Sequence, residues 1–113
     1  MNVIIKFDYF DFSLNCYSLV TREEDQLLFD GDDNTFKAES HEDPYVLMPE
    51  DAVNKGIYAA TIEDANWQDG VYQVSVFKQA GGTPVPANDT KIGTGNIYIR
   101  NGMQVFANDN LLF

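Results

Sequence analysis

Paired carboxylates are the side chains of this sequence with the clearest potential for chemistry. There are 18 Asp and Glu residues against seven Lys and Arg, and many of the acidic residues are adjacent. Two carboxylates held a fixed distance apart in a cleft can hydrolyse a glycosidic bond. These pairs are dispersed over polar segments, where carboxylates usually cap backbone groups, so the pattern favours turn formers. The groups are Glu23-Glu24-Asp25, Asp30 with Asp32 and Asp33, Glu42-Asp43, Glu50-Asp51 and Glu63-Asp64.

One of these acidic groups is a weak calcium candidate. Hard cations prefer clustered oxygen ligands, and the candidate ligands follow one another closely along the chain. They are Asp30, Asp32, Asp33 and Asn34. The segment lacks the bidentate Glu and the loop spacing of an EF-hand, so we predict a turn here and no metal site.

The remaining reactive residues are few. His41, the single histidine, lies in an acidic loop and is expected to be solvated or hydrogen-bonded there. Cys16 is the single cysteine, so no intrachain disulfide is possible, and we predict a small buried hydrophobe. Gly93-Thr94-Gly95 lacks the third glycine and the following helix of a nucleotide-binding loop. The sequence therefore predicts neither an enzyme nor a cofactor.

Length and charge further limit the classes of protein to which this chain can belong. A chain of 113 residues with 44% hydrophobic residues is expected to form one domain, residues 1–113, around one core. The net charge of -11 argues against binding to nucleic-acid phosphates or to an anionic membrane. Charge also interrupts the apolar N-terminal stretch early, and no run approaches the roughly 20 apolar residues of a membrane span.

Apolar and polar residues alternate with a period of two along most of the chain, which is typical of half-buried strands. In the segment 71–79 the alternation places Tyr72, Val74 and Val76 on the core face. Asn101-Gly102 is typical of a type I′ hairpin turn. Beyond a possible helical turn at residues 49–51, no helix is expected. The predicted strands are 3–10, 14–21, 26–30, 35–38, 45–48, 56–62, 71–79, 97–100 and 103–106.

Short strands with frequent turn signals predict an all-β fold, a single antiparallel β-sandwich of the Greek-key or immunoglobulin-like type. Tyr72 follows a glycine-containing turn, as in the tyrosine corner of Greek-key sandwiches, although it could also be a simple core aromatic. Residues 80–95 are predicted to be one long loop with four glycines and two prolines. Such a loop is usually a contact surface, because ordering it costs backbone entropy.

Residues 71–84, continuing into Asp89 and Ile92-Gly93-Thr94-Gly95, resemble a small β-sandwich module that recurs in bacteriophage and prophage structural genes. The resemblance implies a virion structural protein, such as a capsid decoration, neck adaptor or tail- or fibre-associated module. It implies synthesis in the bacterial host cytoplasm, location in the virion, and a homo-oligomer or multi-copy assembly with other virion proteins. The expected interaction residues are Gln79, Gly81, Gly82, Pro84, Asp89, Gly93 and Gly95.

Two other functions are compatible with the residues. A carbohydrate-binding module could stack sugar rings on exposed aromatic residues such as Trp67, Tyr45 or Tyr98, although a loop Trp can equally pack on the core. An acidic mimic of nucleic acid could block a DNA-binding enzyme, but it needs carboxylates ranged along one face.

Overall fold

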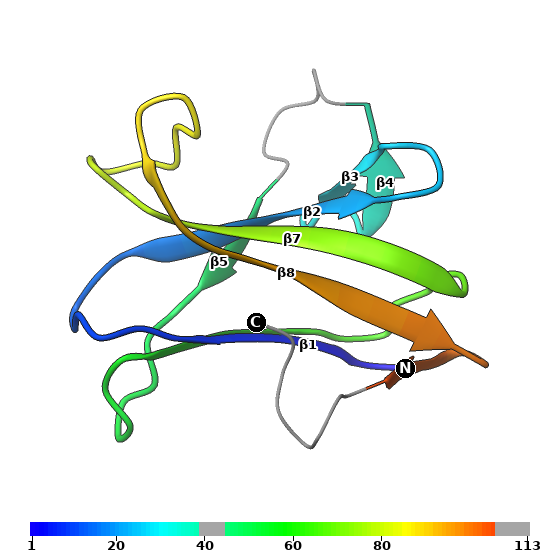
Figure 1. Cartoon of the computed structure of the whole chain (residues 1–113), viewed down its shortest axis with the longest axis horizontal. Helices are drawn as coiled ribbons and strands as arrows, with labels where there is room; N and C mark the ends of the chain where they lie inside the picture. The colour runs from blue at the N-terminus through cyan, green and yellow to red at the C-terminus, as the bar shows by residue number, and fades with distance from the viewer. Residues whose placement is uncertain (39–44, 106–113) are drawn as a thin grey trace.

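The computed structural model describes residues 1–38 and 45–105, which form nine β-strands in two antiparallel sheets and contain no helix (Figure 1). This confirms the predicted all-β sandwich-like fold. The strands are β1 (Val3–Asp8), β2 (Cys16–Arg22), β3 (Leu28–Asp30), β4 (Thr35–Lys37), β5 (Val46–Met48), β6 (Ile57–Ile62), β7 (Gly70–Lys78), β8 (Thr90–Arg100) and β9 (Met103–Val105).

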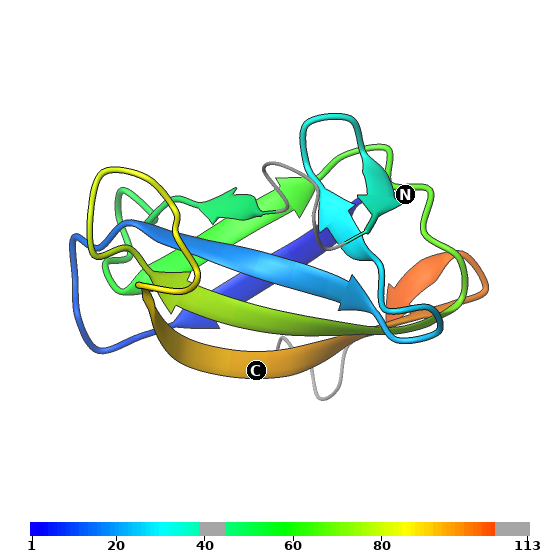
Figure 2. The same ribbon diagram turned by 90° about the horizontal axis from the view of Figure 1, so that it is seen from above.

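The larger sheet has the strand order β4-β3-β2-β7-β8-β9, and the smaller sheet pairs β1 with β6. Strand β5 joins the larger sheet at one end of β2, where Leu47 pairs with Tyr17. The two sheets lie face to face, and the strands of one cross those of the other at an angle when seen from above (Figure 2). Inward-facing residues of both sheets can therefore form one core between the layers.

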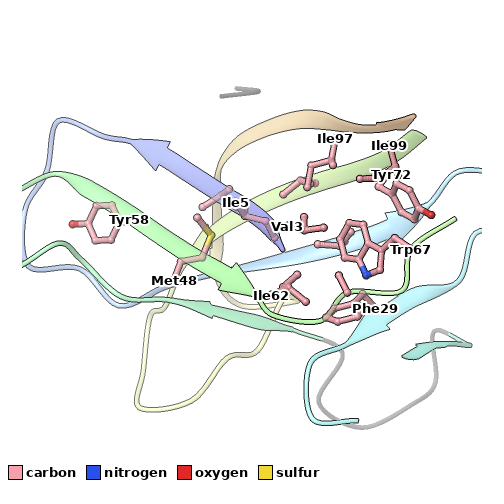
Figure 3. Packing of buried hydrophobic residues seen from close by; sticks show 14 of the residues in the cluster. Val3, Ile5, Phe29, Met48, Tyr58, Ile62, Trp67, Tyr72, Ile97 and Ile99 are labelled. Carbon is pink, nitrogen blue, oxygen red and sulfur yellow. The ribbon is translucent and has the colours of Figure 1, made fainter. Parts of the chain in front are cut away.

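The core is built from alternate residues of the strands and is rich in aromatic side chains (Figure 3). Tyr72, Val74 and Val76 of β7 are all at most 1% exposed, which confirms the predicted core face. Trp67, in the connection between β6 and β7, lies among Phe29, Phe36 and Tyr72 with ring centroids 4.6–5.4 Å apart. The connection is thus part of the core.

Both sides of the sandwich are partly closed by residues that contact the two sheets at once. After β5, the amide of Ala59 in β6 donates to the carbonyl oxygen of Pro49 at 3.2 Å. On the opposite side, the Gln104 side chain of β9 reaches β1. Its amide oxygen accepts from the Ile4 amide at 2.8 Å, and its Nε2 donates to the Ile4 carbonyl oxygen at 2.9 Å. Part of the exposed edge of β1 is therefore covered.

Two local predictions are confirmed. Asn101 and Gly102 have φ values of 54° and 71°, as a type I′ turn requires, and β8 pairs with β9 across them. The Tyr72 hydroxyl donates to the carbonyl oxygen of Gln68 at 2.6 Å, so this residue is both a core aromatic and a tie to the preceding turn, as in a tyrosine corner.

The predicted long loop at 80–95 is wrong. Strand β8 already begins at Thr90 and pairs with β7 from Thr90 to Ile99, with one irregularity opposite Val76 and Phe77. The possible helical turn near residue 50 is also not formed; instead an Asp51 carboxylate oxygen accepts from the amides of Val53 and Asn54 at 2.8 Å.

Candidate functional site

The carboxylate of Asp89 holds the connection between β7 and β8 in one shape. One carboxylate oxygen accepts from the Ala80 amide at 2.8 Å, and the other accepts from the Val85 amide at 2.7 Å and from the Tyr17 hydroxyl at 2.6 Å. Ala80 lies at the start of the connection, and Val85 lies near its middle. Residues 79–89, which we call the Asp89 loop, are therefore fastened both to themselves and to β2.

The Asp89 loop covers a small aromatic cluster outside the main core. Tyr17 points away from the core, because its neighbour Cys16 faces inward, and yet it is fully buried. Its ring stacks on Phe77 at 5.3 Å and meets the edge of Tyr45 at 5.8 Å. The Asp89 loop thus has an apolar base on the outer face of the larger sheet.

The electrostatics of this contact favour an ionised carboxylate. The hydroxyl of Tyr17, followed by the amides of Ala80 and Val85, lowers the pKa of Asp89 below its ordinary value. Burial, followed by the hydrogen bond to Asp89, raises the pKa of Tyr17. The phenol therefore remains a donor and the carboxylate an acceptor over the whole neutral range.

An open groove of about 680 Å³ lies between the Asp89 loop and β5. Gln79, Gly82, Thr83 and Pro84 contribute from the loop, and residues 13–16 also line it. Its remaining lining residues are Tyr45, Leu47, Met48, Pro49 and Glu50. Leu47 is 58% exposed although it belongs to a strand, so the groove offers apolar surface to a partner.

The structure brings part of the expected interaction residues together. Gln79, Gly82 and Pro84 line the groove, and Asp89 fixes the loop that carries them. Gly81 is held from the neighbouring side, since its carbonyl oxygen accepts from the Gln79 amide side chain at 3.2 Å.

Gly93 and Gly95 do not belong to the loop, which corrects the prediction. They pair with Val76 and Val74 in the middle of β8, and residues paired in this way point to the same, inward face. A Cβ atom at Gly93 would lie 2.3 Å from Cε1 of Phe7 in β1. Glycine is needed there because the aromatic ring of the opposite sheet packs directly on the backbone.

The acidic calcium candidate forms a turn around a lysine. The Lys37 ammonium contacts the carboxylates of Asp30, at 3.2 Å, and Asp33. Asp30 also accepts from the Asp32 amide at 2.9 Å, as a turn former does. Among the residues that the structure describes, no group of three or more His, Cys, Asp or Glu side chains could hold a metal ion. Asn34 donates from its side chain to the Asp64 carbonyl oxygen at 3.2 Å.

The other reactive residues and the aromatic candidates can also be placed. Cys16 is buried as predicted, and desolvation raises the pKa of its thiol to about 11. Trp67 is only 5% exposed and packs in the core, so it offers no face for a sugar ring. Tyr98 is 44% exposed on β8, and Tyr45 lines the groove. His41 and the Glu42-Asp43 pair lie outside the described residues.

Tyr17 and Leu47 are the site residues that the sequence did not reveal. Both occur within short, mostly apolar runs, and nothing local indicates that Tyr17 binds a carboxylate 72 positions further along the chain. Comparison with family models, curated proteins and solved structures finds no match to this chain. In the part of the chain described here, no helix is long and apolar enough to cross a membrane.

Replacing Asp89 by asparagine is expected to loosen the loop. The amide side chain has one acceptor oxygen for three donors, so hydrogen exchange at the Ala80 and Val85 amides should become several-fold faster. Because folding lowers the pKa of Asp89, its stabilisation is present above the unfolded pKa of about 3.9 and is lost as pH falls through the lower folded pKa. The difference in amide exchange between the wild type and Asp89→Asn should therefore become smaller as the pH is lowered.

Asp64→Asn is the matched control for this experiment. It removes the same charge from a turn residue whose positive φ of 52° asparagine tolerates, and no hydrogen bond of its carboxylate is recorded among the described residues. Exchange at Ala80 and Val85 should be unchanged in this variant. Equal protection of both amides in wild type and Asp89→Asn at neutral pH would show that the carboxylate does not hold the loop.

Proposed function

We propose that this chain is a non-enzymatic module that docks other proteins through the groove between the Asp89 loop and β5. The observation that carries the proposal is that Asp89 fixes the loop wall of this groove within the chain itself. A partner therefore does not have to order the loop on binding, and the entropy cost of association is reduced. The exposed side chain of Leu47 supplies apolar area that a partner can cover.

We further propose that the partners are virion proteins and that the module is a structural part of a bacteriophage particle. The resemblance of residues 79–95 to a phage structural module supports this assignment. Two residues of the matching segment have structural roles in this chain. Asp89 binds backbone amides of the loop, and Gly93 leaves room for the Phe7 ring. A capsid decoration, neck adaptor or tail-associated module would use such a rigid platform in many copies.

Site-specific photo-crosslinking in assembled particles tests this function. The photoreactive amino acid p-benzoylphenylalanine would replace Thr83 or Leu47 in cells that produce the particle. We expect crosslinks from both positions to the same virion protein, because both residues line the groove. Thr94 is the control position, since it is exposed on the outer face of β8, away from the groove.

The outcome is decided on purified particles. Recovery of the chain in the particles, with crosslinks at positions 83 and 47 and few at position 94, supports the proposal. Absence of the chain from purified particles would refute the virion assignment. Equal crosslinking at all three positions would instead show that the groove is not the docking surface.

A further inference from the structure

Two phenylalanine side chains project from the connection between β1 and β2. Phe10 is 77% exposed and Phe12 is 59% exposed, with Asp11 between them. In the predicted strand 3–10, Phe10 would have continued the alternation of β1, but the strand ends at Asp8. Aromatic residues are enriched at protein interfaces, and large exposed apolar side chains that lie close together commonly mark such a surface.

The backbone that carries these two rings is firmly held. The buried hydroxyl of Tyr58 donates to the Asp11 carbonyl oxygen at 3.0 Å and accepts from the Leu14 amide at 3.2 Å. The Glu50 carboxylate accepts from the Ser13 amide at 3.1 Å. Ser13 itself has a φ of 59°, a left-handed conformation that needs such support. Residues 9–15 therefore form a preorganised loop.

Both phenylalanine rings also pack against neighbouring residues. Phe10 packs against Tyr9 with ring centroids 4.5 Å apart. The ring of Phe12 lies over Gly56, where a Cβ atom would come within 3.0 Å of it and within 2.6 Å of the Tyr9 carbonyl oxygen. Gly56 has a φ of 86°, so the turn requires glycine for conformational reasons as well. Each ring therefore has one side in contact with the protein, while most of its surface is exposed to solvent.

The charges around the rings indicate the chemistry of the partner. Asp8 lies two residues before Phe10 and Asp11 lies between the two phenylalanines, and neither forms an ion pair with any residue that the structure describes. Lys55, in the adjoining turn, has its ammonium group 3.7 Å from the Glu50 carboxylate. With a net charge of -11, the chain repels anionic surfaces and attracts basic ones.

We infer that Phe10 and Phe12 are anchor residues for a protein partner that offers an apolar pocket bordered by Lys or Arg side chains. This inference rests on the proposed docking function and extends it to a second surface at the same end of the sandwich. The loop 9–15, the turn after β5 and the Asp89 loop all lie at the left end in Figure 1. Ser13 and Leu14 also line the groove, so the two surfaces adjoin.

A peptide selection tests the inference without knowledge of the natural partner. A random dodecapeptide library displayed on filamentous phage would be selected on the immobilised wild-type chain and counter-selected on the Phe10→Ser/Phe12→Ser variant. We expect the recovered peptides to combine Lys or Arg with several apolar residues. Their affinity should fall about tenfold or more for the double variant, as for interface hot spots, and should weaken with rising salt.

Three variants distinguish peptide binding by the two phenylalanines from binding by any exposed apolar side chain. Met103→Ser removes an apolar side chain that is 67% exposed on β9 and should leave peptide binding unchanged. Asp11→Asn should weaken binding and reduce its salt dependence. Tyr58→Phe keeps both rings but removes the hydroxyl that holds the loop, so it should weaken binding several-fold and accelerate exchange of the Leu14 amide.

The inference is overturned if no peptide is recovered, or if recovered peptides bind the double variant as well as the wild type. Binding of the wild type, but not of the double variant, to phosphatidylcholine vesicles would assign the rings to a membrane instead. Self-association in analytical ultracentrifugation that the double variant loses would assign them to a second copy. Neither result affects the groove proposal, because crosslinking from position 83 is measured separately.

Discussion

Replacing Trp67 by alanine is expected to lower the free energy of unfolding by about 3–5 kcal/mol, the range for removing a large buried aromatic side chain. The indole is 5% exposed and contacts Phe29, Phe36 and Tyr72, so its removal leaves a cavity between strands of the larger sheet and the β6–β7 connection. The loss would be measured by urea denaturation followed by circular dichroism.

Two further variants show that the effect comes from packing. The Trp67 Nε1 atom is buried and has no hydrogen-bond partner among the described residues, so Trp67→Phe loses only part of the ring and should cost much less. Tyr98→Ala, at a 44% exposed aromatic residue, should change stability by no more than about 0.5 kcal/mol. A Trp67→Ala protein as stable as the wild type would place the indole outside the core and restore it as a possible sugar platform.

The sequence predicted those parts of the fold that depend on local patterns. The period of two located β6 and β7 and the core face of β7, and Asn101-Gly102 located the last hairpin. The acidic residues were expected to form turns, and Asp51 does so at the turn after β5. Asp69 does so as well, because its carboxylate accepts from the amides of Asn101 and Gly102 at 2.8 and 3.0 Å, which lowers its pKa.

The parts that were missed depend on contacts between distant segments. Gly93 and Gly95 suggested a loop because glycine weakens an isolated strand, yet here they lie where the opposite sheet approaches closely. The role of Asp89 depends on Tyr17, which no local pattern connects with it. Strand β1 ends at Asp8 and not at Phe10 as predicted, although the Tyr9 amide still donates to the Gly56 carbonyl oxygen in register with the β1–β6 pairing.

The contact between Gly93 and Phe7 leads to a second large effect. Gly93→Ala is expected to destabilise the protein by about 1–3 kcal/mol, the usual cost of overpacking a filled interior. The added methyl group would lie 2.3 Å from one ring carbon of Phe7 and 2.7 Å from another, so the ring or the strand must move. The ring cannot move without disturbing its stacking on Tyr9 at 5.8 Å.

The effect of Gly93→Ala on stability should change sign when the Phe7 ring is removed. Gly93 does not have a positive φ, so alanine fits its backbone, and replacing a strand glycine by alanine then gains about 0.5–1 kcal/mol. In a Phe7→Ala background, Gly93→Ala should therefore leave the urea midpoint unchanged or raise it. A double-mutant cycle measures this coupling directly. Equal destabilisation in both backgrounds would mean that Phe7 does not pack on Gly93, and that glycine is required in β8 for another reason.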